Sequence, residues 1–159
     1  MVKGSVISRF PLGKQFGSLT RLYYGALTKR LEHLDIERHF SILILIDTSE
    51  KECSQQYISD VMKKDKASMV RIIDYLTEKG YIIRVPNPKD RREYHIKLTD
   101  KANKIMSKIH KGVNDLNRTA TKGLSSQQVK IFYKSIDIIS SNLIKEPAHK
   151  VIVNFKKAK

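Results

Sequence analysis

The chain has 159 residues, of which 31 are Lys or Arg and 16 are Asp or Glu, so its formal net charge is +15. This length fits one domain, or one small binding module plus the helices that join two copies of it. A hydrophobic fraction of 40% excludes a disordered chain, a single cysteine excludes an internal disulfide framework, and the charge indicates a polyanionic partner.

The first predicted element is a helix over residues 12–34, because apolar side chains recur there three or four positions apart. Gly17 and Gly25 weaken this helix and are candidate points of close approach by another helix. Residues 40–46 (FSILILI) are apolar nearly all round, which predicts burial on every side. Periodicity alone fits a strand equally well, but the helical flanks favour a short central helix over residues 37–48.

Residues 54–80 predict two short helices joined by a tight basic connection at Lys63 and Lys64. Ser54 is placed to cap the first helix, Asp65 to cap the second, and Gly80 to end it. The apolar faces comprise Tyr57, Ile58, Val61 and Met62 in the first helix and Met69, Ile72, Ile73 and Leu76 in the second. This arrangement predicts a helix-turn-helix.

The next segment predicts a β-hairpin, or wing, with a charged tip. Residues 81–85 are rich in β-formers, residues 86–92 have the composition of a loop, and residues 93–98 alternate between polar and apolar side chains. A wing of two or three strands is therefore expected directly after the helix-turn-helix.

Two further helices are predicted before a basic tail. Thr99 caps a helix that reaches about residue 120, and a capping box at Ser125 and Gln128 starts a last helix that stops near Pro147. Residues 150–159 are basic, but their apolar side chains predict packing against the preceding helices.

In this order and at these distances, the motifs resemble those of the MarR (multiple antibiotic resistance regulator) family. The segments that carry the resemblance are residues 54–62 (SQQYISDVM), 65–80 (DKASMVRIIDYLTEKG), 88–92 (PKDRR) and the pair Leu98 and Thr99. The resemblance covers roughly residues 12–146. It implies a mainly α fold with a small β wing, in which a winged helix-turn-helix DNA-binding lobe is joined to a helical dimerisation region.

The expected division of the chain has three parts. Residues 1–35 would form an N-terminal dimerisation helix, residues 36–99 the DNA-binding lobe, and residues 100–159 the C-terminal dimerisation helices and tail. The N-terminal and C-terminal helices have apolar faces without an obvious partner in a small winged lobe, which predicts a homodimer.

The second helix of the helix-turn-helix has a side opposite its apolar face that is free to enter a major groove. There Lys66 and Arg71 can reach phosphates or guanine, while small apolar groups can contact a thymine methyl. The family resemblance further implies that Arg92 enters the minor groove and that Asp90 orients it. The candidate DNA-binding residues are Ser54, Gln55, Lys64, Lys66, Ala67, Ser68, Val70, Arg71, Lys89, Asp90, Arg91 and Arg92.

The resemblance also implies a small aromatic or phenolic effector held between the dimerisation helices and the DNA-binding lobe. The candidate residues are Tyr23, Tyr24, His39 and Phe40. Aromatic side chains on buried helices more often belong to the core, so a structural role is the alternative.

No catalytic residue, metal site or cofactor is predicted, because no histidine pair has metal-ligand spacing beside a carboxylate or thiolate and no glycine-rich phosphate loop occurs. Cys53 is interpreted as a structural thiol, with oxidant sensing as the alternative. The N-terminus lacks a long apolar run, so we expect no signal peptide and no membrane span, and a cytoplasmic protein.

The expected function is sequence-specific binding to a pseudo-palindromic operator in double-stranded DNA, as a repressor that a small ligand could release. Two other classes stay open. One is an architectural DNA-binding protein with little sequence preference, and the other is a winged-helix module that binds a protein partner.

Overall fold

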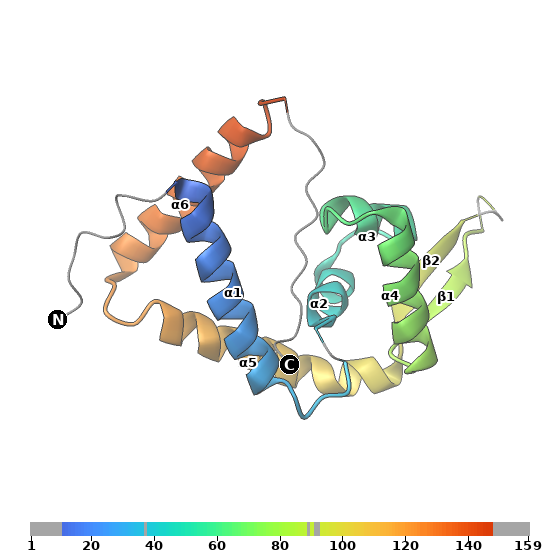
Figure 1. Cartoon of the computed structure of the whole chain (residues 1–159). Helices are drawn as coiled ribbons and strands as arrows, with labels where there is room; N and C mark the ends of the chain where they lie inside the picture. Colours follow the sequence, from blue (N-terminus) through green and yellow to red (C-terminus); the bar gives the residue numbers. More distant parts are fainter. Residues whose placement is uncertain (1–10, 37, 89, 91–92, 148–159) are drawn as a thin grey trace. The chain divides into compact units, whose positions relative to one another are not determined.

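The computed structural model describes residues 11–36, 38–88, 90 and 93–147 of the chain (Figure 1). These residues form six helices and two strands. The helices are α1 (Leu12–Arg30), α2 (Phe40–Thr48), α3 (Gln55–Val61), α4 (Lys66–Glu78), α5 (Asp100–Ala120) and α6 (Ser126–Leu143), and the strands are β1 (Ile82–Pro86) and β2 (Tyr94–Leu98). The predicted class, mainly α with a small β wing, is confirmed.

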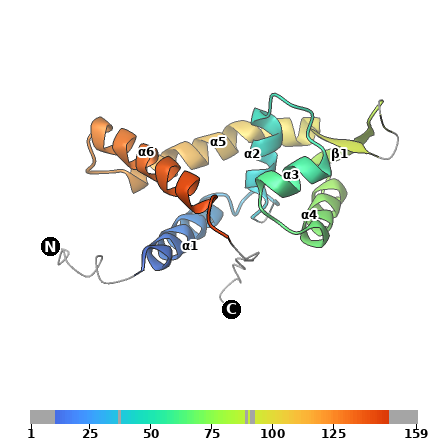
Figure 2. The same ribbon diagram turned by 90° about the horizontal axis from the view of Figure 1, so that it is seen from above.

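The chain forms two compact units, residues 1–114 and 115–159. Within the first unit, α3, α4, β1 and β2 pack together, and we call them the winged lobe; α2 lies against β2 (Figure 2). Each of these elements contributes some fully buried side chains, so the winged lobe and α2 share a common core. Its largest members are Phe40, Ile42, Leu43, Ile58, Met69, Ile73, Leu76, Ile82 and Ile96.

The first two helices are shorter than predicted. Helix α1 ends at Arg30 instead of near residue 34, and α2 begins at Phe40, whereas the predicted start at Glu37 lies outside the described residues. Between them the chain turns through short-range hydrogen bonds, such as Leu34 N–H to the Leu31 carbonyl at 2.9 Å. The turn buries Ile36 and also Leu34, which was predicted to be the last residue of the first helix.

Helix α2 is buried on one side, so the prediction of burial all round is wrong. Phe40, Ile42 and Leu43 are buried, but residues 44–46 are only half-buried in the single chain. Helical geometry explains the difference, because residues on successive 100° steps cannot all face the same core.

The helix-turn-helix forms where the sequence predicts it. The Ser54 hydroxyl accepts a hydrogen bond from Tyr57 N–H at 3.2 Å, and the Asp65 carboxylate accepts one from Ser68 N–H at 2.9 Å, so both caps are present. Lys63 closes the connection in the left-handed region at φ 51°. The predicted apolar face of α3 needs one correction: Val61 is 46% exposed, and Ser59 is buried instead because its hydroxyl donates to the Lys64 carbonyl at 2.7 Å.

The wing is an antiparallel pair in which Ile82 lies opposite Leu98 and Pro86 opposite Tyr94. A third segment joins it, because Ile96 N–H donates to the Cys53 carbonyl at 2.7 Å and Ser54 bridges to His95. Gly80, at φ 72°, lets the chain reverse from α4 into β1, as its position predicted.

Helix α5 buries one stripe of side chains, which includes Ala102, Met106 and Ile109. A Cβ built on Gly112 would lie 2.8 Å from Leu31 Cδ2, so the close approach in this fold is at Gly112. A Cβ built on Gly17 or Gly25 would meet no other described element of the chain within 4 Å, so neither glycine marks a close approach within the described residues. Helix α6 starts at the predicted capping box, and none of its residues is buried.

Candidate nucleic-acid interface

The outward face of α4 is the first part of the candidate interface. Met69, Ile73 and Leu76 are fully buried and fix the rotation of the helix about its own axis. The opposite side therefore exposes four of the predicted residues, namely Lys66, Ala67, Val70 and Arg71. Val70 is 36% exposed, which leaves its methyl groups accessible to a partner.

The remaining candidates on the helix-turn-helix surround the beginnings of α3 and α4. Two of them take part in the helix caps described above. The Ser54 side chain caps α3, and the Ser68 backbone N–H donates to Asp65, which caps α4. Gln55 is half-buried at the first turn of α3, and Lys64 is exposed in the connection. No acidic residue lies in the first turn of either helix, but the Asp65 carboxylate occupies the N-cap of α4, so only the start of α3 has no carboxylate at its cap or first turn.

The wing contributes a stem that the structure describes and a tip that it describes only in part. Asn87 N–H donates to the Glu93 carbonyl at 2.9 Å, and the Asn87 amide donates to the Glu93 carboxylate at 2.8 Å, so these two residues close the base of the tip. Asp90 is exposed. Lys89, Arg91 and Arg92 lie outside the described residues, and the predicted pairing of Asp90 with Arg92 lies there too.

Sequence reasoning missed an ion pair between the recognition helix and the wing. Arg84 on β1 donates through Nη2 to Asp74 Oδ1 on α4, and the Arg84 side chain is half-buried. Asp74 belongs to the outward side of α4, so Arg84 neutralises a carboxylate on the candidate DNA-facing surface. No sequence signal relates the two positions, because they are ten residues apart on a helix and a strand.

The C-terminal end of α4 is held by a second cluster. Lys79 Nζ lies 2.7 Å from the Asp35 carboxylate, and this hydrogen bond raises the pKa of Lys79 above its ordinary value. Lys101 Nζ donates to the Lys79 carbonyl at 2.7 Å and lies 4.4 Å from the centre of the Tyr81 ring. Burial raises the pKa of Tyr81.

The predicted ligand residues divide into two groups. Tyr24 lies edge-on to Tyr23 at 5.9 Å and stacks on the buried Phe40 at 6.1 Å, both measured between ring centres. His39 instead lies 5.3 Å from Tyr75 of α4. These contacts connect α1 with α2 and α2 with α4.

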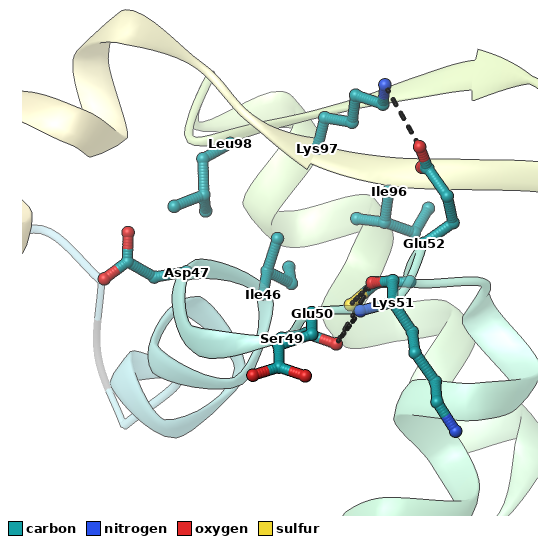
Figure 3. A pocket seen from close by; sticks show the side chains of 10 residues that line it. Ile46, Asp47, Ser49, Glu50, Lys51, Glu52, Ile96, Lys97 and Leu98 are labelled. Carbon is teal, nitrogen blue, oxygen red and sulfur yellow. Dashed lines mark hydrogen bonds and ion pairs between the residues drawn. The ribbon is translucent and has the colours of Figure 1, made fainter.

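A cavity of about 370 Å³ opens between the end of α2, the segment before α3, and β2 (Figure 3). Two of its lining residues, Cys53 and Leu98, were singled out from the sequence. Cys53 is 3% exposed, and its thiol donates to the Lys51 carbonyl at 3.6 Å. Glu52 lies 3.1 Å from His95 and 3.8 Å from Lys97 at the rim.

The described residues contain no group of three or more His, Cys, Asp or Glu side chains arranged to hold a metal ion. Among the same residues, no helix combines the length and hydrophobicity needed to cross a membrane.

The fold matches that of known proteins. A model of the MarR family matches residues 35–93, which include α2, both helices of the helix-turn-helix and β1. The resemblance drawn from the helix-turn-helix and wing motifs is thereby confirmed.

Solved MarR-type structures extend the match along the chain. A MarR transcriptional regulator from Methanosarcina mazei Go1 superposes with a TM-score of 0.77 and 27% identity, over 84% of this chain and 96% of that one. Wild-type apo MarR from E. coli gives 0.68 and 27% over 82% and 96%. A mutant of E. coli MarR, solved in complex with operator DNA, gives 0.74 and 27% over 82% and 94%.

Proposed function

We propose that this chain is a transcriptional regulator that binds operator sites in duplex DNA, as a homodimer and as a repressor. The outward face of α4 carries the proposal. It combines two cations, Lys66 and Arg71, with two small apolar groups, Ala67 and Val70, on a helix whose rotation is fixed by its buried side. Apolar groups gain nothing from water, but they match the thymine methyl in a major groove.

We assign the surrounding candidates to the DNA backbone. Ser54, Gln55, Lys64 and Ser68 lie at the starts of α3 and α4, where backbone N–H groups and a lysine can receive phosphates. Contacts of this kind fix the position of α4 along the groove without reading bases.

We assign the wing tip, with Lys89, Asp90, Arg91 and Arg92, to the adjacent minor groove. A narrow A·T-rich minor groove attracts guanidinium groups, and a neighbouring carboxylate reduces the side-chain freedom that an arginine loses on binding. The stem closed by Asn87 and Glu93 begins beside α4, which supports simultaneous contact with both grooves.

The relatives support the same function, since the mutant MarR from E. coli was crystallised with operator DNA. We carry over three parts as a proposal: a dimerisation helix in residues 1–35, the DNA-binding lobe in residues 36–99, and dimerisation helices with a basic tail in residues 100–159. A small aromatic or phenolic effector would bind at Tyr23, Tyr24, His39 and Phe40. The contact between His39 and Tyr75 gives such a ligand a connection to α4.

The test is selection of duplexes from a random library by the purified protein, followed by affinity measurement. We expect a pseudo-palindromic consensus with half-sites about 34 to 36 Å apart and at least ~10³-fold preference over random duplex. Tight binding with no sequence preference would support an architectural protein instead. Absence of DNA binding at every salt concentration would support a protein-binding module.

A further inference from the structure

The wing has an exposed tyrosine, Tyr94, at the start of β2. It is 48% exposed. Its side chain makes no hydrogen bond, ion pair or ring contact with any residue that the structure describes. A phenol hydroxyl both donates and accepts hydrogen bonds, and a large ring normally gains from burial. The ring and the hydroxyl of this tyrosine are thus available to a binding partner.

The strand register places Tyr94 on the side of the wing that faces α4. Residues two apart on a strand share a side, so Tyr94 lies on the same side as Ile96, which is buried in the core. Its partner across the wing is Pro86, and Pro86 shares a side with Arg84. Arg84 in turn binds Asp74 of α4. Tyr94 therefore continues this side beyond the core and toward the wing tip.

The direction of β1 sets the level of Tyr94 along α4. Strand β1 packs on α4 and runs back beside it after the chain reverses (Figure 1). Val70 precedes Asp74 by one helical turn, about 6 Å. Tyr94, opposite Pro86, lies two strand residues, about 6.6 Å, beyond Arg84. Because the ion pair between α4 and β1 fixes both starting points, Tyr94 lies near the level of Val70.

Tyr94 is also the residue on this side of the wing that is best able to receive a phosphate. All members of this side are described, and they are Ile82, Arg84, Pro86, Tyr94, Ile96 and Leu98. Arg84 is engaged by Asp74, proline has no side-chain donor, and the others are aliphatic. Among these described residues, the Tyr94 hydroxyl is therefore the side-chain hydrogen-bond donor that is not already bonded.

The proposed binding mode brings a DNA backbone to this place. With α4 in a major groove and the wing tip in the adjacent minor groove, the sugar-phosphate backbone that separates the two grooves passes between them. We propose that the Tyr94 hydroxyl donates a hydrogen bond to a phosphate of this backbone. A tyrosine contact of this kind fixes the position of the protein without reading bases. The inference rests on the proposed function, from which it takes the placement of the duplex.

The first test compares Tyr94→Phe with the unmodified full chain on a selected operator duplex. The ring is kept, so the melting temperature should not change, whereas loss of a hydrogen bond to a charged group should weaken binding at least about tenfold. The loss should be equal across single-base operator variants, and the salt slope should stay constant because a neutral hydroxyl displaces no counterion. The matched control is Tyr133→Phe, which changes a 50% exposed tyrosine on α6 and should bind normally.

Duplexes with one neutral methylphosphonate in place of a phosphate identify the bonded group. At one position of each half-site, the substitution should make the affinities of the unmodified chain and of Tyr94→Phe equal, because the variant has no bond to lose there. Three results would overturn the proposal. They are equal affinities of the two proteins for the intact operator, a loss concentrated at one base pair, and a loss that no methylphosphonate position removes.

Failure of the proposed function is a separate result. If library selection yields no preferred duplex, the operator role fails, and the same variants are compared on random duplex, where a phosphate contact needs no consensus sequence. Equal binding of random duplex by Tyr94→Phe and the unmodified chain would then refute the contact as well. If the chain binds no duplex at any salt concentration, both proposals are wrong.

Discussion

Arg71 is the residue with the strongest claim to base recognition, because it is exposed on the first half of α4 beside two small apolar groups, Ala67 and Val70. We expect Arg71→Ala to weaken operator binding by about 1 to 3 kcal/mol, concentrated at one position of the half-site, if the guanidinium reads a base. The melting temperature should not change, because the side chain is exposed. Binding to a panel of single-base operator variants measures the effect.

Arg118→Ala is the control for this prediction, since it removes the same charge outside the winged lobe. A loss spread evenly over the whole operator panel would reassign Arg71 to a phosphate. Equal affinities for the Arg71 and Arg118 variants would remove Arg71 from the interface.

Arg84 has a different role at the residue scale, because it acts through Asp74. Without Arg84, the Asp74 carboxylate would stay unneutralised on the proposed DNA-facing surface and repel phosphates. Arg84→Ala should therefore lower operator affinity, and adding Asp74→Asn should restore part of it. For folding stability, the double-mutant cycle should give a coupling of only about 0.2 to 1 kcal/mol, as for other exposed pairs. If Asp74→Asn does not restore affinity, Arg84 contacts the DNA itself.

At the scale of single elements, the contact of α5 with the turn after α1 depends on a missing side chain. Gly112→Ala would bring a methyl group to 2.8 Å from Leu31 Cδ2, and Leu31 is only 2% exposed, so it has little room to move. We expect a net destabilisation of about 1 kcal/mol, because overpacking outweighs the gain in helix propensity. Denaturant unfolding measures it.

Leu31→Ala tests the cause of that destabilisation. In the Leu31→Ala background, Gly112→Ala should be neutral or stabilising, because the clashing methyl group is gone. A higher melting temperature for Gly112→Ala alone would show that Leu31 adapts without cost.

The elements that the sequence predicted best are those with local signals. Ser54, Asp65 and Ser125 are caps whose partners lie three residues away, so the chain itself contains the complete interaction. The apolar face of α4 was predicted for the same reason. The end of α1 was not, because Leu34 and Ile36 continue a plausible pattern and only the folded core shows that they are buried in a turn.

The candidate site shows the same division. The outward side of α4 follows from its periodicity, so its exposed residues were predicted. The pair of Asp74 with Arg84, the contact of His39 with Tyr75 and the approach of Gly112 to Leu31 depend on how separate elements pack. A glycine in a sequence does not show by itself whether another helix approaches it closely. Gly17 and Gly25 were therefore expected at a close approach, whereas in the described residues that approach is at Gly112.

At the scale of the whole molecule, the exposed apolar face of α6 predicts self-association. Its stripe consists of Val129, Phe132, Ile136, Ile139 and Leu143, of which Phe132 is 43% and Leu143 is 60% exposed. Helix α1 likewise exposes Leu12, Leu19 and Leu22. Exposed apolar surface of this kind marks an interface.

If the chain dimerises through this face as proposed, Phe132→Glu should convert the dimer to a monomer and weaken operator binding, because one half-site contact is lost. Light scattering gives the mass and titration gives the affinity. Lys134→Glu, on the other side of α6, is the control and should stay dimeric. A Phe132 variant that keeps the mass of a dimer would move the interface to another surface.

The third segment of the wing has a consequence for how the winged lobe opens. Ile96 N–H donates to the Cys53 carbonyl, so the residue just before the α3 cap is bound to β2. The Thr99 hydroxyl donates to the Gly80 carbonyl at 2.7 Å, which joins the end of α4 to the start of α5. The helix-turn-helix and the wing are thus closed into one hydrogen-bonded ring. The amide protons of Tyr57 and Ile96 should consequently exchange with deuterium at similar rates, through the same cooperative opening.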